Sequence, residues 1–156
     1  MKFRSRCVLA VASTLALLWA GKAGAAAALA VSAQSELGFG QMVATASPGT
    51  VTVSWSGGRV AAGGSVLGNG LAVSAASFRV SGEPNTAYSI TLPVACTLSR
   101  AGNSMTVDGF ASNPDGSGNL GPLGAQTVLL GATLHLSASQ PSGAYAGSYA
   151  VTVAYN

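Results

Sequence analysis

Charged side chains are scarce in this sequence. Asp, Glu, Lys and Arg make up 7% of the 156 residues, whereas 49% are apolar. A typical soluble domain has about 25% charged residues. A chain this apolar can build a hydrophobic core, which argues against intrinsic disorder, and its lack of charge argues against most cytosolic enzymes. The length suits one domain, or one domain with a processed segment.

The first 25 residues have the pattern of an export signal. A basic segment (residues 2–6) precedes an apolar run of 14 residues from Cys7 to Ala20. That run is too short for a membrane anchor, which needs about 20 residues. Residues 23–25 then have the small-x-small pattern that signal peptidase accepts. We predict cleavage after residue 25, with Ala30 and Ala33 ending two further acceptable sites, and no membrane span in the mature form.

Basic charge and cysteine both become rarer after this cleavage. The whole chain has a formal charge of +3, but three arginines and four acidic residues remain after residue 25, a charge of −1. No basic patch is left for phosphates, so we expect no nucleic-acid partner. Cys96 is then the one remaining thiol, so no internal disulfide can form. It shares the parity of Val94 and Leu98, which favours a small buried hydrophobe over a reactive thiolate.

Helical periodicity is missing after residue 25, and period-two alternation replaces it. Apolar residues alternate with polar ones over residues 51–55, 78–80, 88–98, 128–138 and 145–155, as in strands with one buried face. Turn residues separate these runs at Gly57-Gly58, Gly63-Gly64, Glu83-Pro84-Asn85, Ala101-Gly102-Asn103 and Pro141-Ser142-Gly143. The pattern predicts an all-β protein, an antiparallel β-sandwich, with its longest loop at residues 113–124 and Pro93 at an edge or bulge.

Patterns typical of catalytic and metal sites are also missing. His135 is the one histidine in the sequence, and it lies on the polar parity of its strand. To act as the base of a hydrolase, this histidine would need a second side chain that orients its ring. The Asp115–Asn119 loop has one carboxylate where calcium loops have several. No Cys/His cluster suggests zinc. We therefore expect no catalytic residue, no metal, no cofactor and no enzymatic activity.

The two ends of the mature chain contain the most informative residues. The last strand runs to the C-terminus, with Tyr155 in the penultimate position and Gly143 fourteenth from the end. Near the N-terminus of the mature chain, one parity holds five apolar residues and one serine, namely Leu29, Val31, Ala33, Ser35, Leu37 and Phe39. An exposed apolar strand of this kind tends to pair with another chain.

These features resemble two families. Tyr155 and Gly143 resemble the C-terminal motif of chaperone–usher pilus subunits. The chain from residue 37 onward also resembles an exported bacterial family known as a domain of unknown function. The motifs that support this second resemblance are L-x-F-G at residues 37–40, F-x-V-x-G at 78–82, Y-x-I-x-L-P at 88–93, Gly131-Ala132-Thr133-Leu134 in place of G-G-T-L, and the closing G-x-Y-x-G-x-x-x-V-T-V-x-Y-N at 143–156.

The resemblance to pilus subunits implies an incomplete immunoglobulin-like sandwich (residues 37–156) preceded by a donor extension (residues 26–36). A periplasmic chaperone, an outer-membrane usher and like subunits would be its partners, and the surface fimbria would serve cell adhesion. Donor-strand complementation would use a neighbour's Leu29, Val31, Ala33 and Leu37. The strand that the chaperone engages would include Gly143, Tyr149, Val151, Val153 and Tyr155.

A complete sandwich is the alternative. The segment before residue 37 is short, and cleavage after Ala33 would nearly remove it. The first and last strands would then pair within one molecule, which would be a self-contained secreted binding module. Trp55 and the tyrosines would be available to stack on sugars, although aromatic residues on an apolar parity usually belong to a core.

Overall fold

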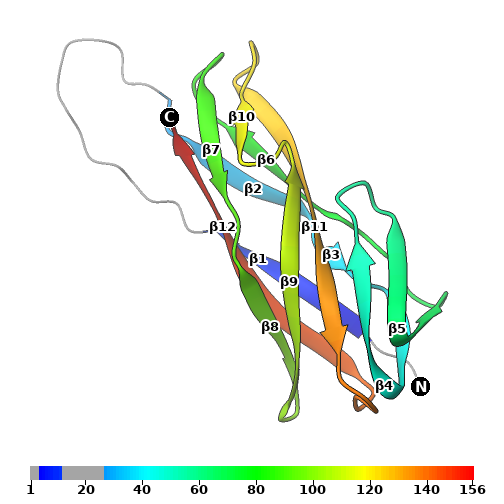
Figure 1. Cartoon of the computed structure of the whole chain (residues 1–156). Helices are drawn as coiled ribbons and strands as arrows, with labels where there is room; N and C mark the ends of the chain where they lie inside the picture. The colour runs from blue at the N-terminus through cyan, green and yellow to red at the C-terminus, as the bar shows by residue number, and fades with distance from the viewer. Residues whose placement is uncertain (1–3, 12–26) are drawn as a thin grey trace.

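The computed structural model describes residues 4–11 and 27–156, and these residues form strands without any helix (Figure 1). The predicted export signal lies outside the described residues except for residues 4–11, which form the first strand. Within the described part of the chain, no helical segment has the length and apolar character required to cross a membrane. The expectation of an all-β, sandwich-like fold is confirmed.

The described strands are long in the body of the domain and short at its margins. Their bounds are β1 Arg4–Val11, β2 Ala30–Ser35, β3 Leu37–Gly38, β4 Gln41–Val53, β5 Arg59–Gly68, β6 Ala76–Ser81, β7 Ala87–Thr91, β8 Ala95–Arg100, β9 Asn103–Asn113, β10 Ser117–Asn119, β11 Ala125–Leu136 and β12 Ala144–Tyr155.

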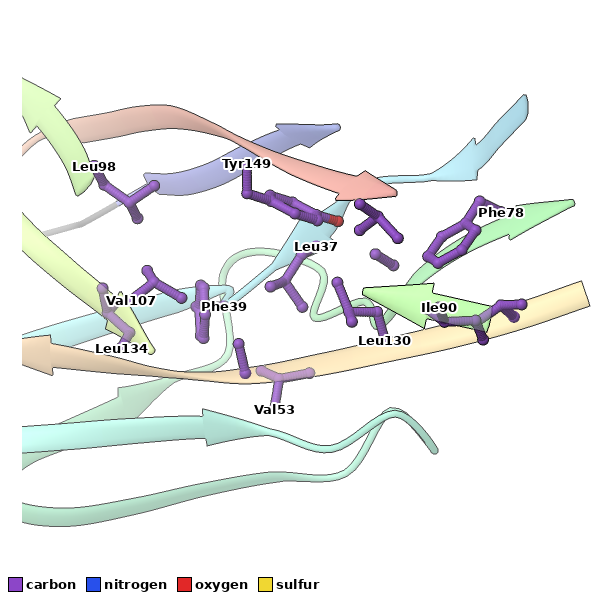
Figure 2. Close-up of a cluster of buried hydrophobic side chains, with 14 of the residues drawn as sticks. Leu37, Phe39, Val53, Phe78, Ile90, Leu98, Val107, Leu130, Leu134 and Tyr149 are labelled. Carbon is purple, nitrogen blue, oxygen red and sulfur yellow. The ribbon is translucent and has the colours of Figure 1, made fainter. Parts of the chain in front are cut away.

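Hydrogen bonds link these strands in the order β10-β7-β12-β8-β9-β11-β4-β5. Four further pairings complete the arrangement: β6 pairs with β11 and β2, and β1 pairs with β12 and β3. The chain folds into two layers, and Figure 2 shows core side chains between the ribbon of β12 and that of β11. Every described strand pairing is antiparallel except that of β1 with β12, which is parallel.

The core is built from the apolar parity of each strand, because alternate residues of a strand face opposite sides. Phe39, Phe78, Tyr88 and Tyr145 are the largest of the fully buried aromatic side chains. Leu37, Leu130 and Tyr149 reach the same cluster from β3, β11 and β12 (Figure 2). The predicted alternation therefore identifies most of the core correctly.

The predicted run over residues 88–98 is not one strand. The structure ends β7 at Thr91 and begins β8 at Ala95, with Pro93 in the gap. Proline has no N–H to donate to a ladder, so pairing stops there. Val94 is consequently 92% exposed, and Cys96 is half-buried, although the sequence pattern placed both in the core.

Two of the predicted turns and loops were also wrong in detail. Gly63 and Gly64 lie inside β5, where the pairing with β4 shifts between Ala44 and Gly49. Gly63 has a φ of 64° there, and Gly64 comes so close to the Ser47 carbonyl that a side chain would not fit. The predicted 113–124 loop contains β10, which pairs with β7. Bulges and short edge strands have no period-two signal, so the pattern could not show them.

Candidate functional site

The most unusual feature of the fold is the position of β1. It lies between β12 and β3, and we call this position the slot (Figure 1). Eight residues of β1 pair in parallel register with β12, from Arg4 opposite Ala144 to Val11 opposite Val151. On the other side, Arg6 and Cys7 pair with Gly38 and Leu37. A segment that we predict to be removed on export thus pairs with strands on both of its sides.

One wall of the slot is the first two thirds of β12. Tyr149 and Val151, two of the five predicted groove residues, lie in the stretch that pairs with β1, and both are buried. Val153 and Tyr155 lie beyond that stretch, where β12 pairs with β7. Gly143 precedes β12 with a φ of 150°, packed against the Arg100 side chain. The structure therefore brings some of the predicted groove residues to the slot and places others outside it.

The opposite wall of the slot is β3 with the residues around it. Leu37 and Phe39 are fully buried in the core and project between the layers (Figure 2). Gly38 exchanges two backbone hydrogen bonds with Ser74, at 2.8 and 3.0 Å. The Ser74 hydroxyl also donates to the Glu36 carbonyl at 2.7 Å. These contacts hold β3 in place on the side away from β1.

The predicted donor residues lie within the sheets of their own chain. β2 pairs in antiparallel register with β6, so that Ala30 is opposite Ser81 and Val31 opposite Val80. Leu29 and Val31 are half-buried against the core and Leu37 is fully buried, whereas Ala33 is exposed beside a register shift. The single face expected for Leu29, Val31, Ala33 and Leu37 is thus interrupted. A donor role for these residues stays a prediction, and it requires β2 to leave β6.

A group of hydrogen bonds fastens the start of β2 to the end of β12; we call it the N-terminal clamp. The Tyr155 hydroxyl donates to the Ala27 carbonyl at 2.6 Å and accepts from the Glu83 amide at 2.7 Å. The Ala27 amide donates to the Glu83 carboxylate at 3.0 Å. Gly82 lies so close to the Tyr155 hydroxyl that a β-carbon there would collide with it. Sequence reasoning identified Tyr155 but missed this role, because its partners are remote in the chain.

His135 is the candidate for acid–base chemistry. Its Nε2 atom lies 2.8 Å from Asp108 Oδ1, with side chains 46% and 43% exposed. The prediction of an exposed strand histidine is confirmed, although sequence reasoning did not identify Asp108 as its partner. A cavity of about 640 Å³ opens beside this pair, lined by His135, Thr50, Ser104, Thr106 and Ser137 among others. Among the described residues, no three His, Cys, Asp or Glu side chains come together as metal ligands would.

The aromatic residues offer little stacking surface. Tyr88, Tyr145 and Tyr149 are buried and Tyr155 is half-buried, so they belong to the core or to the clamp. Trp55 is 41% exposed. A sugar platform built from Trp55 and the tyrosines would therefore be reduced to one residue.

This chain is similar to a known protein family. A search of curated proteins returns no match to this chain. The family described as a domain of unknown function (DUF4402) matches residues 29–155, from just before β2 to the last residue of β12. That match covers both walls of the slot and the clamp residues Glu83 and Tyr155, and the chain belongs to this family.

Proposed function

We propose that this protein is an exported, non-enzymatic structural subunit of a surface fimbria, assembled by donor-strand complementation. One observation supports the proposal most directly: the strand in the slot, β1, belongs to the segment that reads as an export signal. If signal peptidase removes residues 1–25, the slot loses its strand. The subunit that reaches the periplasm is then a sandwich that lacks one strand.

An empty slot is a strong site for another strand. Along residues 144–151 of β12, every second residue would present an unpaired N–H and C=O to the slot, together with the facing edge of β3. A polypeptide in extended conformation satisfies those groups by main-chain hydrogen bonds. Its alternate side chains would reach the core beside Tyr149 and Val151, and each large apolar one buried contributes about 1.5–3 kcal/mol. Several such contacts would make dissociation slow.

The partners that follow from this proposal are proteins with a free strand. A periplasmic chaperone would occupy the slot first, an outer-membrane usher would receive the complex, and a strand of another subunit would replace the chaperone. The register of β1 gives the orientation for the first occupant, which would run parallel to β12. Such head-to-tail contacts between subunits produce open fibres.

The test begins with the exported protein. Mass spectrometry of the form recovered from the periplasm should show the loss of residues 1–25. A synthetic peptide with the sequence of residues 4–11 should then raise its melting temperature, because a ligand specific to the folded state at 100 times its Kd adds about 2.7 kcal/mol.

Peptide variants supply the control. Aspartate in place of Leu9 or Val11, which are opposite Tyr149 and Val151, should abolish the stabilisation. Aspartate in place of Ala10, the position between them, should be tolerated, since alternate residues face opposite sides. If no peptide changes the melting temperature of the processed protein, the proposal is contradicted.

A self-contained exported module is the second candidate. The observation that favours it is the closure of the slot by β1 within one chain. If the exported protein retains residues 4–11, no strand is missing and this second function replaces the first. The same mass measurement therefore separates the two candidates, and glycan-array binding by the intact monomer would then be the next experiment.

A further inference from the structure

We infer that this subunit accepts a strand but does not donate one, so that it occupies an end of the assembly. This inference rests on the proposed function, because it presupposes an open slot. It goes further by identifying which side of the subunit can be joined to a neighbour. Three observations on the described residues support it: the pairing of β2, the N-terminal clamp and the length of chain before β2.

First, β2, the first described strand after the predicted cleavage site, is already paired within its own subunit. β2 pairs with β6 over Ala30–Ser35, and β6 in turn pairs with β11. The chain then continues directly into β3, where Leu37 is fully buried and forms one wall of the slot. If residues 30–37 left to fill a neighbour's slot, the subunit would lose a wall of its own.

Second, the clamp holds the start of β2 from two sides. Tyr155 binds the Ala27 carbonyl and Glu83 binds the Ala27 amide, at 2.6 and 3.0 Å. Tyr155 is the last residue of β12, the strand that forms the other wall of the slot. Cleavage after residue 25 would leave one residue before Ala27. The clamp would then bind the second residue of the mature chain.

Third, too little chain remains before β2. With cleavage after residue 25, residues 26–29 precede Ala30, and four extended residues span at most about 14 Å. The stretch of β12 that pairs with β1 has eight residues, or about 26 Å at about 3.3 Å per residue. Residues 26–29 therefore cannot fill an equivalent slot, and the later cleavage sites would leave even less.

The partner that fits is thus a different polypeptide. It would have a free strand of eight or more residues with apolar side chains at alternate positions. That strand would not be fastened to its own subunit as β2 is fastened by the N-terminal clamp. One such strand would bind each copy of this subunit. The assembly could not grow beyond this subunit, because no free strand projects from the part of the chain that the structure describes.

The experiment uses the whole chain, with a recognition sequence inserted between residues 25 and 26 for a protease that cuts at the end of its site, so that cutting leaves only residues 26–29 before β2. Cutting leaves residues 4–11 in the slot as a separate fragment, which a fluorescent peptide of the same sequence can replace. Uptake of the labelled peptide is measured by size exclusion with light scattering, and self-assembly by SDS-resistant ladders. Both native cysteines are changed to serine, C7S and C96S.

A disulfide between β2 and β6 shows whether β2 is donated. Ser32 and Arg79 are exposed register partners across these strands, so S32C/R79C should lock β2 in place. The matched control is S99C/S104C, which joins exposed register partners of β8 and β9 and leaves β2 untouched.

The expected result is uptake of one labelled peptide per chain, with the same low level of ladders in the unlocked, locked and control proteins. Ladders that form in the unlocked and control proteins, vanish with S32C/R79C and return on reduction would overturn the inference, since β2 would then be the donated strand. Failure of every protein to take up the peptide would overturn both the inference and the proposed function, so the two failures are distinguishable.

Discussion

The hydroxyl of Tyr155 donates a hydrogen bond of 2.6 Å to the carbonyl of Ala27, a residue 128 positions earlier in the chain. The last residue of the family match thus contacts a residue that lies two positions before the match begins. Because Tyr155 also accepts from the Glu83 amide, a single phenol joins β12, the start of β2 and the turn after β6. This gives the penultimate tyrosine a structural role that does not depend on the slot.

Replacing Tyr155 with phenylalanine tests that role. The ring stays and two hydrogen bonds are lost, so the free energy of unfolding should fall by about 1–3 kcal/mol. Amide hydrogen exchange in β2 should accelerate more than exchange in β9 and β11, because the loss is local to the start of β2. Chemical denaturation and exchange measured by mass spectrometry give the two quantities.

Tyr145→Phe is the matched control for this change. The Tyr145 hydroxyl donates to the Pro141 carbonyl at 2.8 Å and accepts from Gln140 at 3.0 Å, away from β2. Its removal should lower global stability and leave the exchange of β2 close to that of the rest of the domain. Equal acceleration of β2 in both variants would show that Tyr155 does not fasten β2.

Gly82 should be required for the clamp. A β-carbon at this position would collide with the Tyr155 hydroxyl and lie 3.1 Å from Leu29 Cδ1, so Gly82→Ala should displace the phenol. We expect a loss of about 1–3 kcal/mol in unfolding free energy, as for other overpacked sites. Gly58→Ala, where the nearest atom is the Ser54 hydroxyl at 3.2 Å, is the control and should cost less.

A double-mutant cycle connects these two changes. If Gly82→Ala acts by moving the Tyr155 hydroxyl, its cost should shrink once that hydroxyl is absent in the Tyr155→Phe background. Residues in direct contact commonly show coupling of about 0.5–3 kcal/mol. Strictly additive losses would mean that Gly82 is needed for another reason.

The sequence pattern was sufficient for the fold class and for most of the core. Val51, Val53, Leu130 and Leu134 are buried as their parity predicts, because strand geometry fixes which residues share a face. The prediction failed at Val94, where Pro93 stops the ladder and the face changes. Periodicity describes which residues of one strand share a face. It does not show where pairing with a neighbouring strand stops.

The candidate site was harder to predict for a different reason. The parity of Leu29 and Val31 is the same whether β2 joins a neighbour or pairs with β6 in its own chain, so the sequence pattern fits both arrangements. The choice depends on contacts between remote residues, such as Ala27 with Tyr155. The pairing of Asp108 with His135 was missed for the same reason, since register between strands is set by the fold.

Leu37 should be among the most sensitive residues of the domain. Its side chain is fully buried next to the slot, and Leu37→Ala should lower the free energy of unfolding by about 2–5 kcal/mol through lost burial and the cavity that remains. Leu123, which is 88% exposed, provides the control, and Leu123→Ala should change stability by less than about 0.5 kcal/mol. Similar costs at both positions would contradict the burial of Leu37.

The Asp108–His135 pair should contribute little to stability. Both side chains are nearly half exposed, and exposed ion pairs typically contribute about 0.2–1 kcal/mol. A cycle of Asp108→Asn, His135→Ala and the double variant, measured by urea denaturation, should give a coupling within that range. A coupling of several kcal/mol would identify the pair as a structural element and would require a reason beyond surface electrostatics.

Alkaline pH should destabilise the domain through Tyr88. This side chain is fully buried, and burial raises its pKa above the ordinary value of 10.0. Its hydroxyl donates to Gln126 Oε1 at 2.8 Å, a bond that only the protonated phenol can make. The stabilising effect of the protonated form is therefore complete below about pH 10 and declines as the pH rises through the folded-state pKa, because the unfolded chain releases the proton more readily.

Tyr88→Phe isolates this effect from the titration of other groups. The variant lacks the hydrogen bond at every pH, so it should be less stable than the wild type at pH 8, and the difference between the two should narrow between pH 10 and 11. The narrowing cannot exceed about 1.4 kcal/mol per pH unit for one proton. Unfolding free energies from urea titrations at pH 8, 9, 10 and 11 measure it, and a constant difference would mean that Tyr88 keeps its ordinary pKa in the folded protein.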